Sequence, residues 1–349
     1  MAMTQSSTTA APLPATKRHF SFGGLLRRPE TGSVLGLLTV LVFFTIFGGE
    51  SFVAPAGAAS WLNVAGGLGI VAIPIGLLMI AGELDISIGA MIPASSMTIA
   101  ILSGHYQMPT IVGIAAALAL GALVGFINGF LVVRTAVPSF IVTLGTMFAV
   151  NGFTLGMSVI LTGTTSVAIK AEPWAKWALG HFIGGAFQVI IIWWIVDALI
   201  FAFFLHFTRF GNWIFAMGGD KVSARNAGIP TERMTILLFV LSATSAAFVG
   251  LSQAILYNSA QVSAGQSYIF NAIIAVVVGG VLLTGGYGSV VGIVVGTLTF
   301  GIVNQGIYYT GFDANWASLI IGVLLLVAVL MNNTFRKMAL AHTTAKAKA

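Results

Sequence analysis

Ten runs of apolar residues constrain the fold of this chain more than any other feature of its sequence. A helix needs about 20 apolar residues to cross the hydrocarbon core of a bilayer. Of the 349 residues, 58% are hydrophobic and only 7% are charged, whereas roughly a quarter of a soluble domain is charged. The sequence therefore predicts an all-α polytopic membrane protein with about ten transmembrane helices in a lipid bilayer. The runs cover residues 33–49, 62–81, 86–103, 109–132, 139–161, 184–206, 235–257, 269–284, 288–308 and 316–332.

The run at 269–284 is short, and a Gly-rich turn at 284–288 joins it to the next run. We expect either two crossings here or one broken, re-entrant element. The segments 72–91 and 275–294 share one order: an apolar run, a Gly-bearing turn and a second apolar run. Transporters often contain such repeats, with discontinuous helices near the substrate path. The likeness fits either a duplicated unit or the general sameness of spans rich in Gly, Val and Ile.

Basic residues predict the orientation of the spans, because cytoplasmic loops near span ends are enriched in Lys and Arg. With ten spans and a cytoplasmic N-terminus, thirteen of the fifteen basic residues fall on the inner side. These are Lys17, Arg18, Arg27, Arg28, Arg134, Arg209, Lys221, Arg225, Arg233, Arg336, Lys337, Lys346 and Lys348. Only Lys170 and Lys176 fall outside, in the loop at 162–183. We therefore expect both termini and the loop at 208–234 on the cytoplasmic side.

The chain divides into three parts on this basis. A polar, basic cytoplasmic segment at 1–32 precedes a transmembrane domain at 33–332, which contains the loop at 208–234, and a basic cytoplasmic tail follows at 333–349. The first apolar run lacks a small-residue cleavage site, which indicates a retained span rather than a removed signal peptide.

Catalytic signatures are missing from the sequence. No Lys follows a Gly, which excludes the phosphate-binding loop G-x-x-x-x-G-K-[ST], and neither G-x-S-x-G nor H-E-x-x-H occurs. Cysteine is absent and the five histidines lack metal-ligand spacing. The basic residues lie at span ends rather than on one face, which does not favour a nucleic-acid partner. We expect a protein that is no enzyme and needs no cofactor or metal, with any ATP hydrolysis in a partner subunit.

Two carboxylates, Glu83 and Asp85, lie between long apolar runs in the segment GELDISIG at 82–89. A carboxylate costs several kcal/mol to place in lipid, so both must face water, a polar path or a helix N-terminus. Asp85 and Ser87 are placed to cap the following span. The alternative is that Glu83 and Asp85 line the translocation path or its gate.

Asp197 is the one acid well inside a predicted span. An acid within a membrane span is by default a candidate for function, and a carrier coupled to an ion would need one. The other reading is a structural hydrogen bond to a neighbouring helix.

Neutral polar side chains recur at depth within the spans. Amides there bond across helices, worth about 1 kcal/mol or less in a membrane, and they also match the hydroxyls of a sugar. Uncharged amides without paired acids suit a neutral polyhydroxyl solute better than an ion. The residues are Asn128, Thr143, Asn151, Asn271, Asn304 and Gln305.

The loop at 208–234 contains the signals of a two-turn helix outside the membrane. Gly218 and Gly219 turn the chain, and Asp220 is placed as the N-cap. Gly228 supplies the C-terminal stop and Pro230 blocks continuation. On these signals alone, the segment is either a solvated connector or a docking element for a partner.

Four segments in this order resemble the membrane permease subunits of bacterial ABC importers for simple sugars, the ribose, xylose and arabinose type. They are GELDISIG at 82–89, NGFLVVRTAVPSFIVTLGTM at 128–147, GGDKVSARNAGI at 218–229 and IAVVVGGVLLTGGYGSVVGIVVGTLTFGIVNQGI at 274–307. The resemblance covers nearly the whole chain after residue 60. Asp220 stands where the family usually has Asn, Lys221-Val222 stands where an acidic pair is frequent, and Asn271 stands where Asp is common.

The resemblance implies a multi-pass protein of the bacterial inner membrane that imports a simple sugar. Residues 218–228 would be the coupling helix that docks into a cytoplasmic ATP-binding subunit. An extracytoplasmic sugar-binding protein would deliver the solute, and a second permease copy or a sister permease would complete the pair. The implied coupling residues are Gly218, Gly219, Asp220, Lys221, Ser223, Ala224, Arg225 and Gly228. The candidate path residues are Glu83, Asp85, Thr143, Asn151, Asn271 and Asn304.

A secondary carrier coupled to H⁺ or Na⁺ is the alternative from another class. It would use Asp197, Glu83 or Asp85 as its coupling acid. A passive channel or scaffold is a third class, which no feature of the sequence favours.

Overall fold

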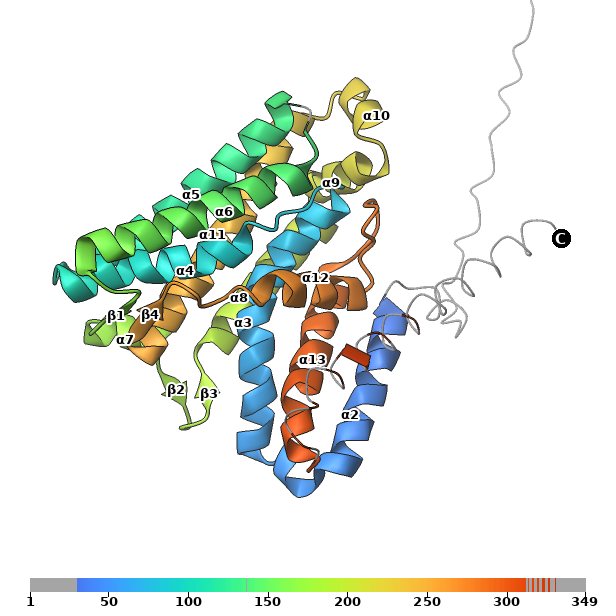
Figure 1. Ribbon diagram of the computed structural model, residues 1–349. Helices are drawn as coiled ribbons and strands as arrows, with labels where there is room; N and C mark the ends of the chain where they lie inside the picture. The colour runs from blue at the N-terminus through green and yellow to red at the C-terminus, as the bar shows by residue number, and fades with distance from the viewer. Residues whose placement is uncertain are drawn as a thin grey trace, which may run out of the picture.

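The computed structural model describes residues 30–135 and 137–311, together with isolated positions between 313 and 330. Eight helices in this part of the chain are long and apolar enough to cross a membrane, which confirms the prediction of an all-α polytopic membrane protein. The predicted span at 316–332 lies largely outside the described residues. Figure 1 shows the helices as a bundle with short strands and loops at its ends.

The first part of the chain forms α2 (Glu30–Val53), α3 (Pro55–Ile80), α4 (Ile88–Ile99), α5 (Thr110–Thr135) and α6 (Ser139–Thr162). A π-helical turn, Ala100–His105, extends α4. The second part forms α7 (Pro173–Leu179), α8 (Ile190–Phe207), α9 (Arg209–Gly219), α10 (Lys221–Asn226), α11 (Thr231–Tyr257), α12 (Tyr268–Val278) and α13 (Val290–Gly306), followed by a 3₁₀ turn, Ile307–Tyr309.

Two small antiparallel sheets lie at the end of the bundle opposite α10 (Figure 1). β1 (Ser166–Ala168) pairs with β4 (Ser259–Gln261), with Val167 opposite Ala260. β2 (Phe182–Ile183) and β3 (Phe187–Gln188) form a hairpin. The chain segments before α8 and before α12 are therefore fixed to this end of the molecule.

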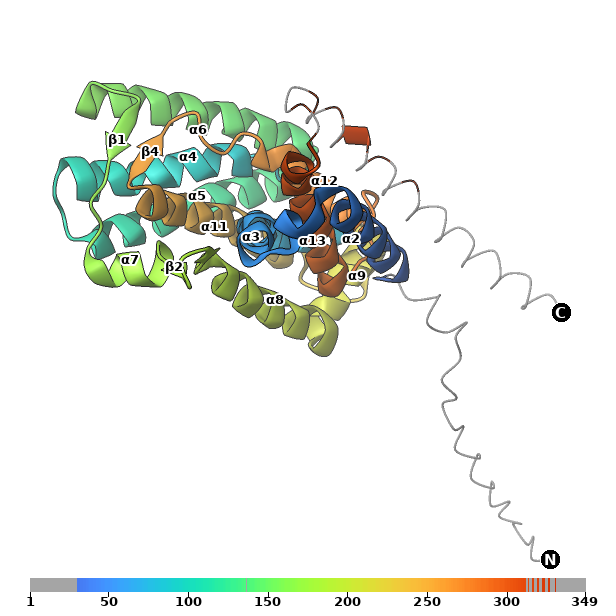
Figure 2. The same ribbon diagram turned by 90° about the horizontal axis from the view of Figure 1, so that it is seen from below.

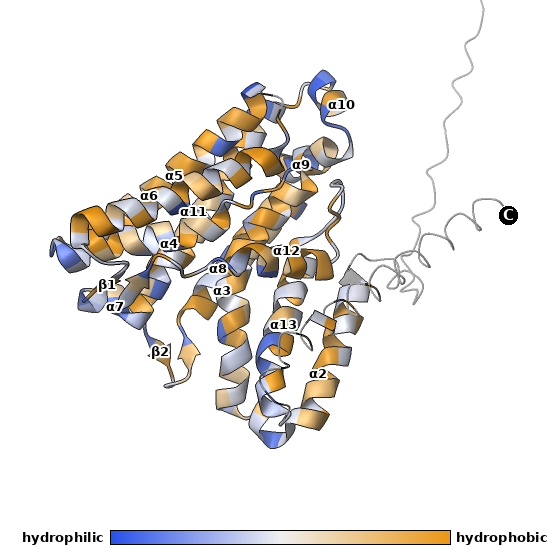
Figure 3. Ribbon diagram, in the orientation of Figure 1, coloured by the Kyte–Doolittle hydropathy of each residue, from blue (hydrophilic) through white to orange (hydrophobic). Residues whose placement is uncertain are grey.

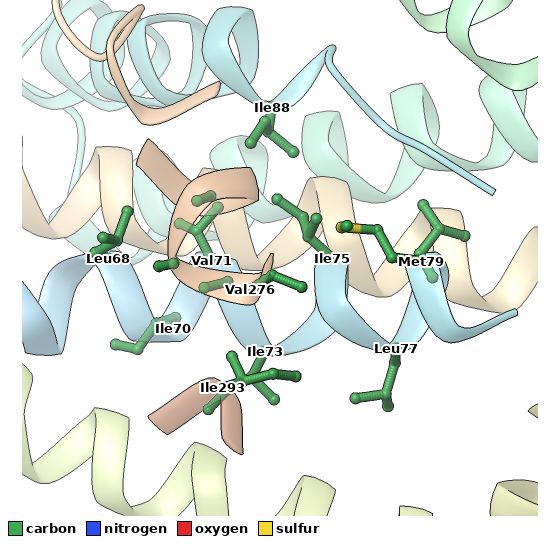
Figure 4. Packing of buried hydrophobic residues seen from close by; sticks show 14 of the residues in the cluster. Leu68, Ile70, Val71, Ile73, Ile75, Leu77, Met79, Ile88, Val276 and Ile293 are labelled. Atoms are coloured by element: carbon green, nitrogen blue, oxygen red, sulfur yellow. The ribbon is translucent and has the colours of Figure 1, made fainter. Parts of the chain in front are cut away.

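α3 is the central helix of the bundle. Of its most apolar stretch 89% is buried, against 11% for α6. A helix that is apolar on all sides is expected to be buried, and Figure 2 shows α3 surrounded by its neighbours. In Figure 4, Val276 of α12 lies against Val71 and Ile293 of α13 lies against Ile73.

The outer helices expose apolar side chains instead. Phe148 and Phe153 of α6 are more than half exposed, as is Leu199 of α8. Figure 3 shows hydrophobic residues along α5 and α6 and hydrophilic residues at α10. Apolar outer faces with polar ends suit helices that cross a bilayer.

The short run predicted at 269–284 is not one continuous helix. α12 has only 11 residues, and α13 begins at Val290 after a non-helical break at 279–289. Residues 81–87 form a similar break between α3 and α4. The run is therefore a short helix followed by a break, and 72–91 and 275–294 both fold as two helices around a break.

A stripe of three glycines joins α5 to α11. Gly121, Gly125 and Gly129 recur every four residues, so they lie on one face of α5. A Cβ on Gly125 would lie 2.5 Å from the carbonyl oxygen of Phe239 and 2.6 Å from the Cα of Val240. Small residues at this spacing allow two helix backbones to approach closely in a membrane.

We expect Gly125→Ala to lower the free energy of unfolding by about 1–3 kcal/mol, because overpacking a tight interface forces the backbones apart. Thermal unfolding of the purified protein in detergent measures the effect. Gly152→Ala on α6 is the matched control, since nothing lies within 4 Å of its added Cβ. Equal melting temperatures for the two variants would show that the α5–α11 contact is looser than described.

Candidate functional site

The first helix break, 81–87, is built around the carboxylate of Asp85, which is fully buried. Its Oδ1 accepts hydrogen bonds from the amide of Ser87 at 2.9 Å and from the hydroxyl of Ser87 at 2.6 Å. Its Oδ2 accepts from the hydroxyl of Ser242 on α11 at 2.8 Å. Asn128 on α5 donates from Nδ2 to the Ser87 hydroxyl at 2.8 Å. Asp85 and Ser87 together thus tie the break to α11 and α5.

Asp85 does not cap α4 in the way that the sequence suggested. α4 begins at Ile88, and its N-cap residue Ser87 makes no side-chain capping bond. The Asp85 carboxylate instead binds the amide two residues ahead of it, in the turn before the helix. Asp85 therefore does not stabilise the first turn of α4 as expected, and its carboxylate instead bonds to Ser242 of α11.

The N-terminus of α6 holds the other side of the break. Ser139 Oγ accepts from the Leu84 amide at 3.1 Å, and Thr143 Oγ1 accepts from the Ile86 amide at 3.3 Å. Thr143 also donates to the Ser139 carbonyl oxygen at 2.8 Å. These bonds satisfy backbone groups that a helix break would otherwise leave unpaired at depth. In this conformation Thr143 therefore supports the break.

The second helix break, 279–289, contacts the first. The amide of Gly286 donates to the carbonyl oxygen of Ile80 at 2.8 Å. Gly285 and Gly286 both have positive φ, which favours glycine. Ser289 Oγ accepts from the Gly292 amide at 3.0 Å and so caps α13.

Gly218, near the end of α9, lies where the two breaks meet. A Cβ on Gly218 would be 1.8 Å from the Ile80 carbonyl oxygen and 2.3 Å from the Gly286 amide nitrogen. No side chain fits there without moving backbone. We call the backbone of Ile80, Gly82, Gly218, Gly285 and Gly286 the glycine junction.

α10 follows directly and has the form that the sequence predicted. The Asp220 side chain accepts from the Ser223 amide as the N-cap, and this hydrogen bond lowers the pKa of the carboxyl. The chain leaves the helix through Gly228, whose φ is +85°. Ala224 is the one buried residue of the helix, and Val222 is 68% exposed. α10 is thus a capped, projecting helix with little contact to the bundle.

Two ion pairs involve α10. Lys221 Nζ lies 2.5 Å from Glu83 Oε1, and Arg225 lies 2.8 Å from Glu232 at the start of α11. The Glu83 side chain is only 12% exposed, whereas both partners of the second pair are largely exposed. The first pair connects α10 to the first break. Glu83 and Lys221 were assigned to different groups from the sequence, and the structure brings them together.

The remaining candidate path residues do not join this network. Asn151, Asn271 and Asn304 lie on α6, α12 and α13, and within the described residues none of them hydrogen-bonds to the Asp85 group. Asn304 Oδ1 accepts from the neighbouring Gln305 at 2.8 Å. Asp197 Oδ2 on α8 is buried and lacks a hydrogen-bond partner in the described part of the chain. The structural bond expected between Asp197 and another helix is not formed by this oxygen.

The sequence reasoning did not predict α9. Its buried residues Gly211, Ile214 and Met217 recur every three positions, which places them on one helix face. This spacing could have predicted the helix from the sequence, but it is hard to recognise because the segment 208–234 is mostly polar. α9 positions Gly218 at the glycine junction and leads directly into α10.

Comparison with known proteins gives consistent matches over most of the chain. The model of the family described as "Branched-chain amino acid transport system / permease component" matches residues 57–329. The ribose import permease protein RbsC of Escherichia coli strain K12 is 32% identical, over 76% of this chain and 81% of its own length. The fructose import permease protein FrcC of Rhizobium meliloti is 30% identical, over 87% and 84%.

The ribose import permease protein RbsC of Bacillus subtilis strain 168 is 30% identical, over 92% of this chain and 97% of its own length. These matches confirm the resemblance drawn from the four sequence segments. They also support a multi-pass protein of the bacterial inner membrane, in agreement with the eight apolar helices.

We expect Asp85→Ala to lower the free energy of unfolding by about 2–3 kcal/mol, because it leaves three buried donors without an acceptor. Asp85→Asn keeps one acceptor oxygen and adds a donor for Ser242, so we expect a loss of about 1 kcal/mol or less. Thermal unfolding in detergent measures both. If Asp85→Asn unfolds like the wild type but abolishes transport, the carboxylate acts in the path itself.

Proposed function

Because this chain belongs to the family of branched-chain amino acid transport system permease components, we propose that it forms the translocation path of an ATP-driven importer for a simple sugar. The family description names amino acids, but the relatives described above are named for ribose and fructose. The neutral amides within the spans are chemically suited to a polyhydroxyl solute. The relatives therefore favour a sugar over an amino acid.

The observation that carries this proposal is the attachment of α10, together with Gly218 at the end of α9, to both helix breaks. α10 projects from the bundle with one buried residue, as a docking element for another protein would. The Lys221–Glu83 ion pair and the contacts of Gly218 link it to the breaks. We take α10 with its flanking residues 218–228 as the element that docks on a separate cytoplasmic ATPase subunit.

Coupling would follow from these contacts. ATP binding closes a pair of ATPase subunits and moves α10 on each permease. Because Gly218 is packed against the Ile80 carbonyl and the Gly286 amide, that movement shifts the breaks that end α3 and precede α13. The bundle then switches between outward-open and inward-open arrangements as packed bodies, rather than by continuous deformation.

The orientation of the chain decides on which side of the membrane each partner binds. Both termini and α10 face the cytoplasm, where most basic residues gather. The two small sheets and α7 then face outward, and an extracytoplasmic sugar-binding protein docks there. Its contact surface comprises the loops near 50–60, 162–183, 258–268 and 309–315.

Two permease copies, or this chain and a sister permease, make up the transporter. Each chain offers one α10, whereas a pair of ATPase subunits presents two docking grooves. The exposed outer faces of the bundle leave room for such a pairing within the membrane.

An ion-coupled carrier is the second candidate, and one observation favours it. Glu83 and Asp85 are engaged in an ion pair and in hydrogen bonds, but the buried Oδ2 of Asp197 has no partner among the described residues. Of Glu83, Asp85 and Asp197, Asp197 is therefore the acid that could bind the coupling ion. Asp197→Asn would abolish uptake in such a carrier.

Sugar uptake by vesicles that contain the permease, its ATPase and its binding protein tests the two candidates. The importer predicts uptake that requires ATP and the ATPase and that continues in the presence of an uncoupler. Uptake driven by a proton gradient without ATP, and abolished by Asp197→Asn, would replace the importer with the carrier.

We expect Arg225→Glu to weaken association with the ATPase by about tenfold or more, because like charges across an interface are strongly unfavourable. Co-purification of the ATPase with the tagged permease measures this. Glu232→Gln is the matched control: it breaks the same ion pair but leaves the charge of α10 unchanged. An exposed pair contributes about 1 kcal/mol or less to stability, so both variants should insert and fold.

If Arg225→Glu retains the ATPase as the wild type does, Arg225 is not part of the docking surface. If both variants lose the ATPase equally, the Arg225–Glu232 pair positions α10, and the ATPase does not recognise the positive charge of Arg225.

A further inference from the structure

A cavity lies at the end of the bundle opposite α10. It is bounded by the first part of α3, the ends of α7 and α11, the starts of α8 and α12, and the β2–β3 hairpin. Its volume is about 110 Å³, and it opens to the surroundings. This cavity is distinct from the candidate path residues and from the helix breaks.

The polar groups of the cavity are all neutral. They belong to Asn63, Gln188, Ser252, Gln253, Tyr257 and Tyr268, and aliphatic side chains form the rest of the lining. Among the described residues that line the cavity, none is an acid, a Lys, an Arg or a His. An ion would lack a compensating charge there. A neutral solute with several hydroxyls, each of which both donates and accepts, matches amides and hydroxyls.

The hydrogen bonds inside the cavity leave groups available to a ligand. Gln253 donates from Nε2 to the Tyr268 hydroxyl at 2.8 Å, which leaves the hydroxyl proton to donate. The same amide keeps its Oε1 as an acceptor. Ser252 donates to the Phe248 carbonyl oxygen at 2.7 Å and retains acceptor capacity. The α11–α12 side of the cavity therefore offers a ligand both a donor, on Tyr268, and acceptors, on Gln253 and Ser252.

The opposite wall is preformed. Asn63 on α3 accepts from the backbone N–H of Gln188 at 2.8 Å and donates to the Ala186 carbonyl oxygen at 3.1 Å. Both bonds hold the β2–β3 hairpin against α3. Gly67 also lines the cavity, and a Cβ there would lie 3.3 Å from the Tyr268 hydroxyl. The lack of a side chain at Gly67 leaves room for the hydroxyl that faces the ligand space.

We propose that this outer cavity binds one neutral monosaccharide within each permease chain, on the outward side of the helix breaks. The identity of the ligand rests on the proposed function, whereas the site rests on the cavity and its hydrogen-bonding groups. The sugar would sit among the amides of Gln188 and Gln253 and the hydroxyl of Tyr268. It would be held there by this chain and not only by the delivering protein.

The absence of cysteine from the chain allows a direct test. Ser252→Cys places a single thiol in the cavity wall, and the full-length variant in lipid nanodiscs is treated with a small methanethiosulfonate reagent. D-Ribose, D-fructose and D-galactose are each added as probes. We expect at least one of them to slow modification of this thiol about fivefold or more at saturation. Thr165→Cys, exposed at the same end outside the cavity, is the control and should react at an unchanged rate.

Two further variants link the protection to the named groups. In the Ser252→Cys background, Gln253→Leu and Tyr268→Phe should each raise the sugar concentration for half protection by about two- to tenfold, as expected for one lost hydrogen bond. If Ser252→Cys does not purify as a folded protein, Gln188→Cys on the hairpin wall replaces it in the same measurement.

Protection by none of the three sugars, or equal slowing at Thr165→Cys, would overturn the proposal. ATP-dependent uptake by the complete transporter separates this result from the proposed function. ATP-dependent uptake without protection of the thiol would contradict sugar binding in the outer cavity and would support the importer. Protection without ATP-dependent uptake would support the sugar site and contradict the ATP-driven mechanism.

Discussion

The contact of Gly218 with the backbone of both helix breaks is the constraint on which the rest of this structure depends. A Cβ at that position would lie 1.8 Å from the Ile80 carbonyl oxygen, so even a methyl group is excluded. α9, the end of α3 and the break before α13 therefore meet backbone to backbone. Helices in a membrane lack a hydrophobic driving force toward one another, and close backbone packing is one of the few interactions that can replace it. α10 begins three residues after this contact, at Lys221.

The polar groups near the breaks stabilise this arrangement. Breaking a helix at depth frees amide and carbonyl groups that lipid cannot satisfy. The hydroxyls of Ser139 and Thr143 accept from two of these amides, and the Asp85 carboxylate accepts from a third. Ser242 then fixes the same carboxylate to α11. Two of the path candidates offered by the sequence, Asp85 and Thr143, thus have a structural task in this conformation, whereas the neutral groups of the outer cavity keep capacity for a ligand.

Local features of this chain were predictable from sequence, and contacts between distant segments were not. Run length predicted the long helices because span length is fixed by bilayer thickness. The cap at Asp220 and the stop at Gly228 act within a few residues, so their pattern is visible in sequence. The Glu83–Lys221 pair joins residues 138 positions apart, and the outer cavity collects residues from six elements. Their proximity follows from packing around α3, which periodicity alone does not specify. The docking role proposed for α10 comes from the resemblance to importer permeases, because the loop alone also fits a solvated connector.

The central claim is that the glycine junction transmits movement of α10 to the helix breaks, and Gly218→Ala tests it most directly. Gly219→Ala is the neighbouring control, because nothing lies within 4 Å of its added Cβ. ATPase association, ATP hydrolysis and sugar uptake would be measured on the same reconstituted transporter. The account predicts that Gly218→Ala retains the ATPase and hydrolyses ATP but loses uptake, while Gly219→Ala behaves as the wild type. Wild-type uptake by Gly218→Ala would contradict it.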